Sequence, residues 1–252
     1  MSRLSVVIIT YNEEENIKDC LESVKWAEEI IVVDSFSQDK TVEICREFTD
    51  KIYLKDFKGY ALEKNFGIEK AQGEWILNID ADERVSPQLQ KEIEGILKEG
   101  TPYSGFLIPR KNYFLGKWMR YGGWYPDRLL RLFKKEKGKF ELREVHEKVL
   151  VEGELGFLSS PLIHNTYKNI AQYIKKQNNY STLAARELAK TKKDFKGNIF
   201  SLSLQIILKF LETYIYKRGA LDGLYGFLVS VLSSFFVFVK WTKLWEMQRK
   251  NE

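Results

Sequence analysis

The sequence lacks several motifs that mark common protein classes. It has only two cysteines, Cys20 and Cys45, whose spacing fits no metal motif, so we expect two buried thiols in a reducing compartment. No Gly-x-Gly-x-x-Gly or Walker A element occurs, which argues against dinucleotide and P-loop binding. Internal repeats and low-complexity segments are also missing. We expect no signal peptide, because the first apolar strand begins almost at Met1.

Strand-like and helix-like patterns alternate in the first eighty residues. Apolar runs rich in β-branched residues predict buried strands that begin near residues 4, 29, 51 and 75. Apolar residues at helical spacing predict helices at 17–24, 41–48 and 60–71. This alternation predicts a parallel α/β sheet with right-handed crossovers. In such sheets ligands bind beyond the carboxyl ends of the strands.

Polar residues follow three of these predicted strands, and we expect Asn12, Asp34, Asp80 and Asp82 to face one crevice. In an extended chain Asp80 and Asp82 would project the same way. Two carboxylates about 5 Å apart repel by roughly 3 kcal/mol at an effective dielectric of 20. A divalent cation with oxygen ligands, Mg²⁺ or Mn²⁺, would offset that repulsion. The alternative is a solvated acidic turn that caps a helix beginning near Ser86.

Three blocks carry a family resemblance. They are Val-Val-Ile-Ile-Thr-Tyr-Asn-Glu-Glu at 6–14, Val-Val-Asp-Ser-x-Ser-x-Asp-x-Thr at 32–41 and Asp-Ala-Asp-Glu at 80–83. In this order and spacing, over roughly the first 110 residues, they resemble family 2 glycosyltransferases. The resemblance implies the GT-A fold, a mixed, mainly parallel sheet with flanking helices, and a nucleotide-sugar donor.

Later segments resemble one branch of that family, the lipopolysaccharide-core glucosyltransferases. They are Gly-Trp-Tyr-Pro-Asp-Arg-Leu-Leu-Arg-Leu-Phe at 123–133, Val-His-Glu at 145–147 and His-Asn at 164–165. This resemblance implies an inverting, metal-dependent transfer of a hexose, as from UDP-glucose, to a lipid-linked saccharide such as lipopolysaccharide core. The alternatives are a polyprenyl-phosphate sugar transferase and a non-catalytic membrane adaptor. A nucleotidyltransferase is disfavoured because Thr-Tyr-Asn-Glu-Glu occupies the place of its Gly-rich loop.

The donor and metal residues follow from the strand ends and the resemblance. Asp34 is suited to accept from the N3–H of uracil, and Asp80 from a ribose hydroxyl. The expected donor-binding residues are Thr10, Tyr11, Asn12, Glu13, Asp34, Ser35, Lys58, Lys64, Asp80 and Ala81. The two lysines are placed to reach phosphates, and the alternative for them is a solvated surface position. Asp82 is the expected Mn²⁺ or Mg²⁺ ligand. His164 is a second metal or diphosphate contact, with a structural hydrogen-bonding role as the alternative.

Inversion by single displacement needs a carboxylate that takes the proton of the acceptor hydroxyl. Glu147 is the first candidate, because it follows a strand-like run at 140–145 and the branch places its base candidate there. Asp127 is the second, at the end of an aromatic loop whose composition suits sugar stacking. Ion pairing with a neighbouring Arg or Lys is the structural alternative for both.

The C-terminal third is basic and apolar. Residues 168–218 carry eleven Lys/Arg against three Asp/Glu, and predict helices at 170–190 and 199–218. A charge-free run of sixteen residues, 224–239, falls short of the roughly 20 that a spanning helix needs. We therefore expect a catalytic domain at 1–167 and an extension at 168–252 that lies on the cytoplasmic membrane surface. A buried hairpin or oligomer interface and a true span are the alternatives, whereas nucleic acid fits poorly.

Overall fold

A computed structural model describes residues 3–142, 148–191 and 199–249. The chain forms two compact units. The first comprises Met1–Arg110 and Asp127–His164, and the second comprises Lys111–Pro126 and Asn165–Glu252. The predicted functional division after residue 167 is a different partition and stays a prediction.

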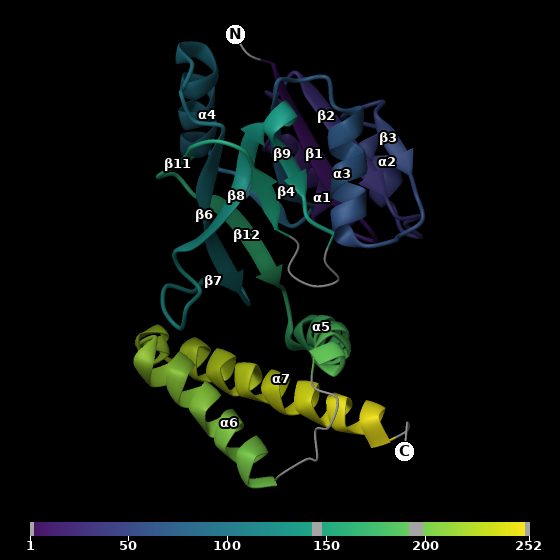
Figure 1. The fold of residues 1–252 in the computed structure, drawn as a ribbon. Coiled ribbons are helices and arrows are strands. Elements are labelled where there is room, and N and C mark those ends of the chain that lie inside the picture. Colours follow the sequence, from purple (N-terminus) through teal and green to yellow (C-terminus); the bar gives the residue numbers. More distant parts are fainter. Residues whose placement is uncertain (1–2, 143–147, 192–198, 250–252) are drawn as a thin grey trace. The chain divides into compact units, whose positions relative to one another are not determined.

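The first half of the main sheet is parallel, as the alternating pattern predicts. Its strands run in the order β3-β2-β1-β4, and all pair in parallel (Figure 1). Their bounds are β1 Leu4–Thr10, β2 Glu29–Asp34, β3 Ile52–Leu54 and β4 Trp75–Asp80. The helices between them are α1 Ile17–Glu22, α2 Thr41–Cys45 and α3 Tyr60–Lys70. β1 is central, as its continuous apolar sequence predicts.

The second half of the sheet contains antiparallel strands, so the sheet is mixed, as the GT-A resemblance implies. β4 is followed in the sheet by β8, β6, β12 and β5, and β11 and β7 pair with β6. These strands are β5 Glu83–Val85, β6 Gly105–Phe114, β7 Lys117–Trp118, β8 Asp127–Lys134, β11 Leu155–Phe157 and β12 Leu162–Tyr167. Helix α4 spans Pro87–Glu99, and the 3₁₀ turn η1, Lys135–Lys137, leads to β9. β9, Gly138–Phe140, pairs with β10, Val149–Val151, in a separate ribbon.

Side chains of β1 alternate between two hydrophobic cores. Val6 and Ile8 pack in the core that includes Cys20 of α1, whereas Val7 packs on the opposite face with Ile68 of α3. α3 approaches the sheet closely because Gly67 has no side chain; a Cβ there would clash with Val7. Both cysteines are buried free thiols, as expected. Burial on both faces fixes the register of the strands whose ends carry the polar residues.

The second unit is mainly helical. Its elements are α5 Ile170–Thr191, α6 Ile199–Leu211, the π-helical turn η2 Glu212–Tyr216, the 3₁₀ turn η3 Gly219–Asp222 and α7 Leu224–Arg249. α7 packs along both α5 and α6. Phe114 and Met119, from the segment before the helices, share a core with Tyr173 of α5 and Val229 of α7.

Several predicted boundaries were wrong. α2 ends at Cys45 instead of near residue 48. β9 ends at Phe140, so residues 141 and 142 of the run predicted at 140–145 are not in a strand, and the rest of that run lies outside the described residues. The helix predicted at 199–218 changes to a π-helical turn at Glu212. The charge-free run at 224–239 belongs to a helix of 26 residues, so its length no longer argues against a membrane span. By length and composition, Ile199–Tyr216 and Leu224–Arg249 could each cross a bilayer.

Candidate functional site

The carboxyl ends of three parallel strands meet at one edge of the sheet. Thr10 at the end of β1 is in register with Asp34 at the end of β2. On the other side, Ile9 is in register with Asp80 at the end of β4. The expected convergence of polar residues at this edge is therefore present, at the place where open α/β sheets bind ligands.

The loops after β1 and β2 are joined by hydrogen bonds. Asp34 is fully buried, and its two oxygens accept from the backbone N–H and the hydroxyl of Ser37, at 2.8 and 2.5 Å. The backbone N–H of Asn12 donates to Ser37 Oγ at 2.8 Å, and Asn12 Oδ1 accepts from Gln38 N at 2.7 Å. Asn12 adopts a left-handed conformation with φ of 53°, which asparagine tolerates better than most residues. The predicted base-recognition residues thus belong to an ordered double loop.

The other expected donor residues of this edge differ in exposure. Tyr11 is 56% exposed, whereas the side chain of Thr10 is buried. Ser35 donates its hydroxyl to Glu63 Oε2 of α3 at 2.7 Å. Burial raises the pKa of Glu63 despite the opposing effect of this hydrogen bond and of Lys55. Of the remaining residues of the expected set, the Glu13 N–H donates to Thr41 Oγ1, Lys58 is exposed, and Ala81 is buried.

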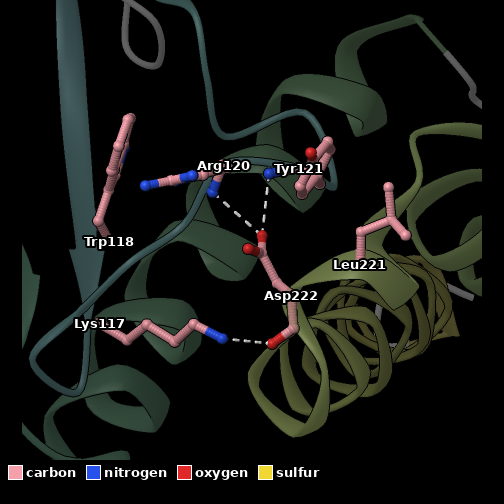
Figure 2. Close-up of a pocket in the computed structure, with 6 residues that line it drawn as sticks. All are labelled: Lys117, Trp118, Arg120, Tyr121, Leu221 and Asp222. Atoms are coloured by element: carbon pink, nitrogen blue, oxygen red, sulfur yellow. Dashed lines mark hydrogen bonds between the residues drawn. The ribbon is translucent and has the colours of Figure 1, made fainter.

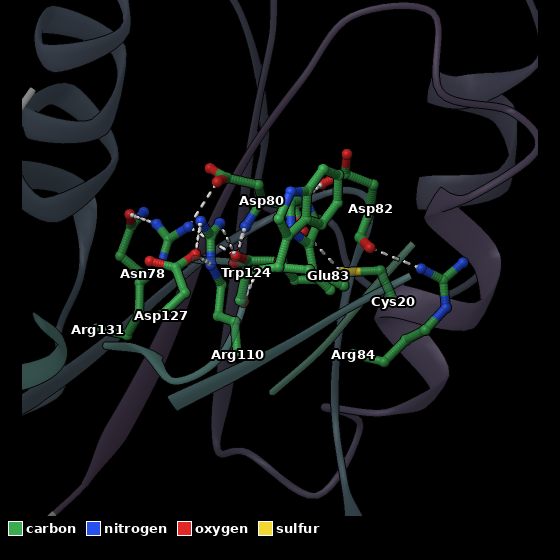
Figure 3. Close-up of polar contacts among 12 residues, drawn as sticks. Cys20, Asn78, Asp80, Asp82, Glu83, Arg84, Arg110, Trp124, Asp127 and Arg131 are labelled. Atoms are coloured by element: carbon green, nitrogen blue, oxygen red, sulfur yellow. Dashed lines mark hydrogen bonds and ion pairs between the residues drawn. The ribbon is translucent and has the colours of Figure 1, made fainter. Parts of the chain in front are cut away.

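Asp80 is held by two cations, Lys64 and Arg131, and Figure 3 shows its contact with Arg131. Lys64 Nζ lies 3.0 Å from Asp80 Oδ1, and Arg131 Nη2 lies 2.6 Å from Asp80 Oδ2. Arg131 Nη2 also lies 2.8 Å from Glu83 Oε1, and Glu83 Oε2 accepts from the backbone N–H of Asp80 at 3.0 Å. Lys64, Arg131 and Glu83 are all at most 4% exposed. The charge of Asp80 is thus compensated inside the protein.

Arg110 extends this network to Asp127. Its Nη1 lies 2.9 Å from Glu83 Oε1, while its Nε and Nη2 donate to Asp127 Oδ2 at 3.0 and 2.5 Å. The ion-paired chain therefore runs Lys64, Asp80, Arg131, Glu83, Arg110, Asp127. Opposite charges alternate along it, which is how buried charges are tolerated.

The network shifts the proton affinity of its members. Burial on its own raises the pKa of Asp80, but Arg131 and Lys64 outweigh burial and hold that pKa well below the usual range. Burial lowers the pKa of Arg131, but Asp80 and Glu83 outweigh it, so this pKa is raised. The pKa of Arg110 is likewise raised, because Glu83 and Asp127 outweigh burial and the repulsion of Arg131. All three groups are therefore charged at neutral pH.

The prediction that Asp80 and Asp82 extend from one strand was wrong. β4 ends at Asp80, Ala81 and Asp82 form a turn, and β5 begins at Glu83. The bond from Asp80 N–H to Glu83 Oε2 closes this turn. The two aspartates consequently have different neighbours: Asp80 meets Lys64 and Arg131, while Asp82 lies near His164.

Asp82 and His164 are brought together, as the metal assignment requires. His164 Nε2 lies 3.5 Å from Asp82 Oδ1, and both side chains are about a tenth exposed. β12 places the histidine there, because His164 is in register with Glu83 of β5. A carboxylate oxygen and an imidazole nitrogen suit Mn²⁺, and Mg²⁺ sites also use few protein ligands. In the part of the chain that the structure describes, no third His, Cys, Asp or Glu joins them, so phosphates and water would complete the shell.

The two candidate bases stand differently. Asp127 begins β8 and is about a third exposed, with one oxygen bound to Arg110. Glu147 lies outside the described residues.

Three residues of the ion-pair network were not predicted from the sequence: Arg110, Arg131 and, in its pairing role, Glu83. The available signal was a single arginine inside the apolar run Leu129–Phe133, because a charge inside a strand core needs a partner.

Comparisons with known proteins show the family to which this chain belongs. Residues 5–150 match the profile of glycosyl transferase family 2. LpsC of Rhizobium meliloti, a lipopolysaccharide core biosynthesis glycosyltransferase, is 29% identical over 96% of this chain and 92% of its own. An uncharacterized glycosyltransferase of Rickettsia typhi is 31% identical over 100% of this chain and 89% of its own.

A solved structure supports the fold. The mannosyltransferase PcManGT from Pyrobaculum calidifontis, in complex with GDP-Man and Mn²⁺, superposes with a TM-score of 0.56 at 15% identity, over 97% of this chain and 87% of its own. The mixed, mainly parallel sheet of the present chain, with its flanking helices, is the GT-A fold that the sequence blocks imply. The chain therefore belongs to glycosyltransferase family 2, as a GT-A enzyme that uses nucleotide sugars.

Proposed function

We propose that this enzyme transfers a hexose from a nucleotide sugar such as UDP-glucose to a lipid-linked saccharide such as lipopolysaccharide core, with inversion at the anomeric carbon. The observation that carries the proposal is the pair Asp82 and His164, 3.5 Å apart, beside the edge where β1, β2 and β4 end. The similarity to LpsC over nearly the whole chain supports the acceptor class.

The double loop after β1 and β2 is the proposed nucleotide site. Ser37 donates to both oxygens of Asp34 and so holds its carboxylate in one orientation, while each oxygen keeps a further lone pair that could accept from a base. Tyr11 and Asn12 flank it, and the exposed ring of Tyr11 can cover an aromatic base. The ion pair between Asp80 and Lys64 keeps both side chains charged and oriented. A ribose hydroxyl would donate to Asp80, and a phosphate would accept from Lys64.

Asp82 and His164 are the proposed ligands of a Mn²⁺ or Mg²⁺ ion. When bound, such an ion neutralises the diphosphate and so stabilises the leaving group. The ion-pair network also stabilises the position of Asp82, because Glu83 Oε2 accepts from Asp80 N–H and so closes the turn that contains Asp82. Lys64 is the proposed cation nearest the phosphates and Lys58 a second, exposed one.

The chemistry is a single displacement. An oxygen of the acceptor forms a bond to the anomeric carbon, the bond from that carbon to the diphosphate oxygen breaks, and a carboxylate takes the hydroxyl proton. Glu147 is the proposed base. Asp127 is the second candidate, but Arg110 already occupies one of its oxygens with two hydrogen bonds, which reduces the acceptor capacity left for a hydroxyl.

The proposed division of labour is a catalytic domain at 1–167 and a membrane-attached extension at 168–252. Apolar side chains of α6, η2 and α7 are exposed in the structure. They include Ile199, Phe200, Ile207, Leu208, Ile215, Leu224, Phe227 and Phe235. An apolar surface of this kind on two adjacent helices fits attachment to the cytoplasmic face of a membrane, where a lipid-linked acceptor would be met.

The test is transfer of labelled glucose from UDP-glucose to lipopolysaccharide with a truncated core, by the purified full-length enzyme. Glu147→Gln should lower turnover at least a hundredfold, since general base catalysis contributes about 10²–10⁴. Full activity in Glu147→Gln together with loss in Asp127→Asn would assign the base to Asp127. Transfer to polyprenyl phosphate, unaffected by Glu147→Gln, would favour the polyprenyl-phosphate enzyme, because a phosphate acceptor needs no strong base. Donor binding without any transfer would favour the adaptor.

A further inference from the structure

The second unit contains an open hollow of about 560 Å³ between two segments that are distant in sequence (Figure 2). One wall is β7 and the loop after it, with Lys117, Trp118, Arg120 and Tyr121. The other wall is η3, with Leu221 and Asp222. None of these residues belongs to the donor edge or to the buried ion-pair network described above. The hollow is therefore a separate feature of this enzyme.

The lining of the hollow is basic and aromatic. The guanidinium of Arg120 lies 4.4 Å from the centre of the Trp118 ring. Lys111 is outside the lining, but its Nζ lies 4.6 Å from the same ring. Lys117 Nζ lies 5.0 Å from the ring of Tyr225. Stacking on an aromatic face holds an arginine in place while leaving the edge of its guanidinium available for hydrogen bonds.

The single acid in the lining is already occupied. Asp222 is 3% exposed, and its Oδ2 accepts from the backbone N–H groups of Arg120 and Tyr121 at 3.0 and 2.9 Å. Its backbone carbonyl accepts from Lys117 Nζ at 2.6 Å, which leaves two donors on that ammonium. Over the described ranges, Arg120 has no ion-pair partner. The hollow thus carries positive charge that no carboxylate of the lining neutralises.

The hollow adjoins the exposed apolar surface of the same unit. η3 connects η2 to α7, and Leu221 of η3 is 63% exposed. Tyr216 at the end of η2 and Leu224 at the start of α7 are 83% and 68% exposed. The turn is tightly built: a Cβ on Gly219 would lie 2.6 Å from the carbonyl oxygen of Thr213. A fixed turn therefore places apolar side chains beside the cations.

We propose that this hollow binds the phosphate group of a membrane lipid, with Arg120 as the main anchor, Lys117 as a supporting cation of the lining, and Lys111 as a further cation beside Trp118. A guanidinium offers paired donors that match phosphate oxygens, and the adjacent apolar residues match acyl chains. The same phosphate chemistry could be presented by a lipid headgroup or by a free phosphomonoester. The inference rests on the membrane attachment in the proposed function, but not on the donor site.

The experiment is sedimentation of the full-length protein with two kinds of phosphatidylcholine vesicle of equal negative surface charge. One kind contains phosphatidic acid and the other oleic acid, so that only the first presents an accessible phosphomonoester. Arg120→Gln should lower binding to phosphatidic acid vesicles at least fivefold relative to wild type, and Arg120→Lys should lower it less. The matched control is Arg186→Gln on the exposed side of α5, which should change binding less than twofold.

Two results would overturn the proposal. One is an equal loss in Arg120→Gln and Arg186→Gln, and the other is an equal loss for Arg120→Gln on both kinds of vesicle; either would indicate a general charge effect. Calorimetry with glycerol 3-phosphate identifies the source of the phosphate. Binding that Arg120→Gln abolishes supports recognition of a free phosphate, and no binding, with the vesicle difference retained, supports a lipid headgroup. Stabilisation of wild type by nucleotide sugars tests the donor site separately, so its failure leaves this result interpretable.

Discussion

Arg131 Nη2 donates to Asp80 Oδ2 at 2.6 Å, and this contact joins the antiparallel half of the sheet to the parallel half. Arg131 comes from β8 and Asp80 ends β4, which is the strand next to it. The Asp80 carboxylate at the end of β4 is therefore positioned by a residue 51 positions later in the chain. Loss of this single cation would leave Asp80 with Lys64 alone and weaken the support of Glu83.

Arg131→Met should destabilise the protein by about 3 kcal/mol, because it leaves the buried carboxylate of Glu83 with Arg110 as its remaining cation and the partly exposed carboxylate of Asp80 with Lys64. In a chain of this size that corresponds to a fall in melting temperature of about 2–4 °C for each kcal/mol. Arg128→Met is the matched control on the same strand, where the side chain is exposed, and it should change stability by about 0.5 kcal/mol or less. Equal stability of the two variants in thermal unfolding would show that the network contributes little.

Glu63→Gln should stabilise the enzyme at neutral pH but not in acid. Burial raises the pKa of folded Glu63 above its ordinary value of 4.5, so the unfolded state releases this proton first as pH rises. Glu63 therefore lowers stability progressively as pH rises from about 4.5 through its folded-state pKa, and the glutamine avoids that cost. Urea unfolding at pH 4 and pH 7.5 measures this. A variant that gains equally at both values would contradict the assignment.

Much of the fold could be predicted from the sequence, because the parallel half is built from local patterns. Continuous β-branched runs predicted β1 and β2, and their ends placed Thr10 and Asp34 together. The partners of Asp80 could not be found in this way, since Arg131 reaches it through an antiparallel pairing between distant segments. The alternation of side chains along an extended strand also gave the wrong position for Asp82, because that pattern does not predict the turn at Ala81. The base candidate Glu147 stays a prediction.

The exposed apolar surface of α6 should mediate membrane attachment. Ile207 and Leu208 are 56% and 52% exposed, and the double variant Ile207→Glu/Leu208→Glu should bind vesicles at least tenfold more weakly than wild type. Leu150→Glu, at a position 52% exposed in the first unit, is the control and should bind normally. Truncation after residue 167 is a poorer test, because Phe114 and Met119 would lose their packing against α5 and α7. If the wild-type protein bound to vesicles of no composition, the proposed membrane attachment would be refuted.

Asp82→Asn should abolish metal-stimulated turnover while the fold is retained. The substitution keeps the shape of the side chain but removes the charge that a hard cation requires. Asp50→Asn, at an exposed position, is the control and should keep full metal-dependent activity. Titration of activity against Mn²⁺ and Mg²⁺ makes the measurement, and circular dichroism checks the fold. A variant whose metal response equals that of wild type would remove Asp82 from the metal site.

The most direct test of the account is thermal stabilisation of the enzyme by nucleotide sugars, with and without Mn²⁺. A ligand that binds only the folded state stabilises by about 2.7 kcal/mol at a hundred times its dissociation constant. Because each kcal/mol raises the melting temperature of a chain this size by about 2–4 °C, the resulting change in melting temperature is readily measured. We expect stabilisation by UDP-glucose or a related nucleotide sugar, larger with Mn²⁺, with the Mn²⁺-dependent part lost in Asp82→Asn. No stabilisation by any nucleotide sugar, with or without metal, would contradict it.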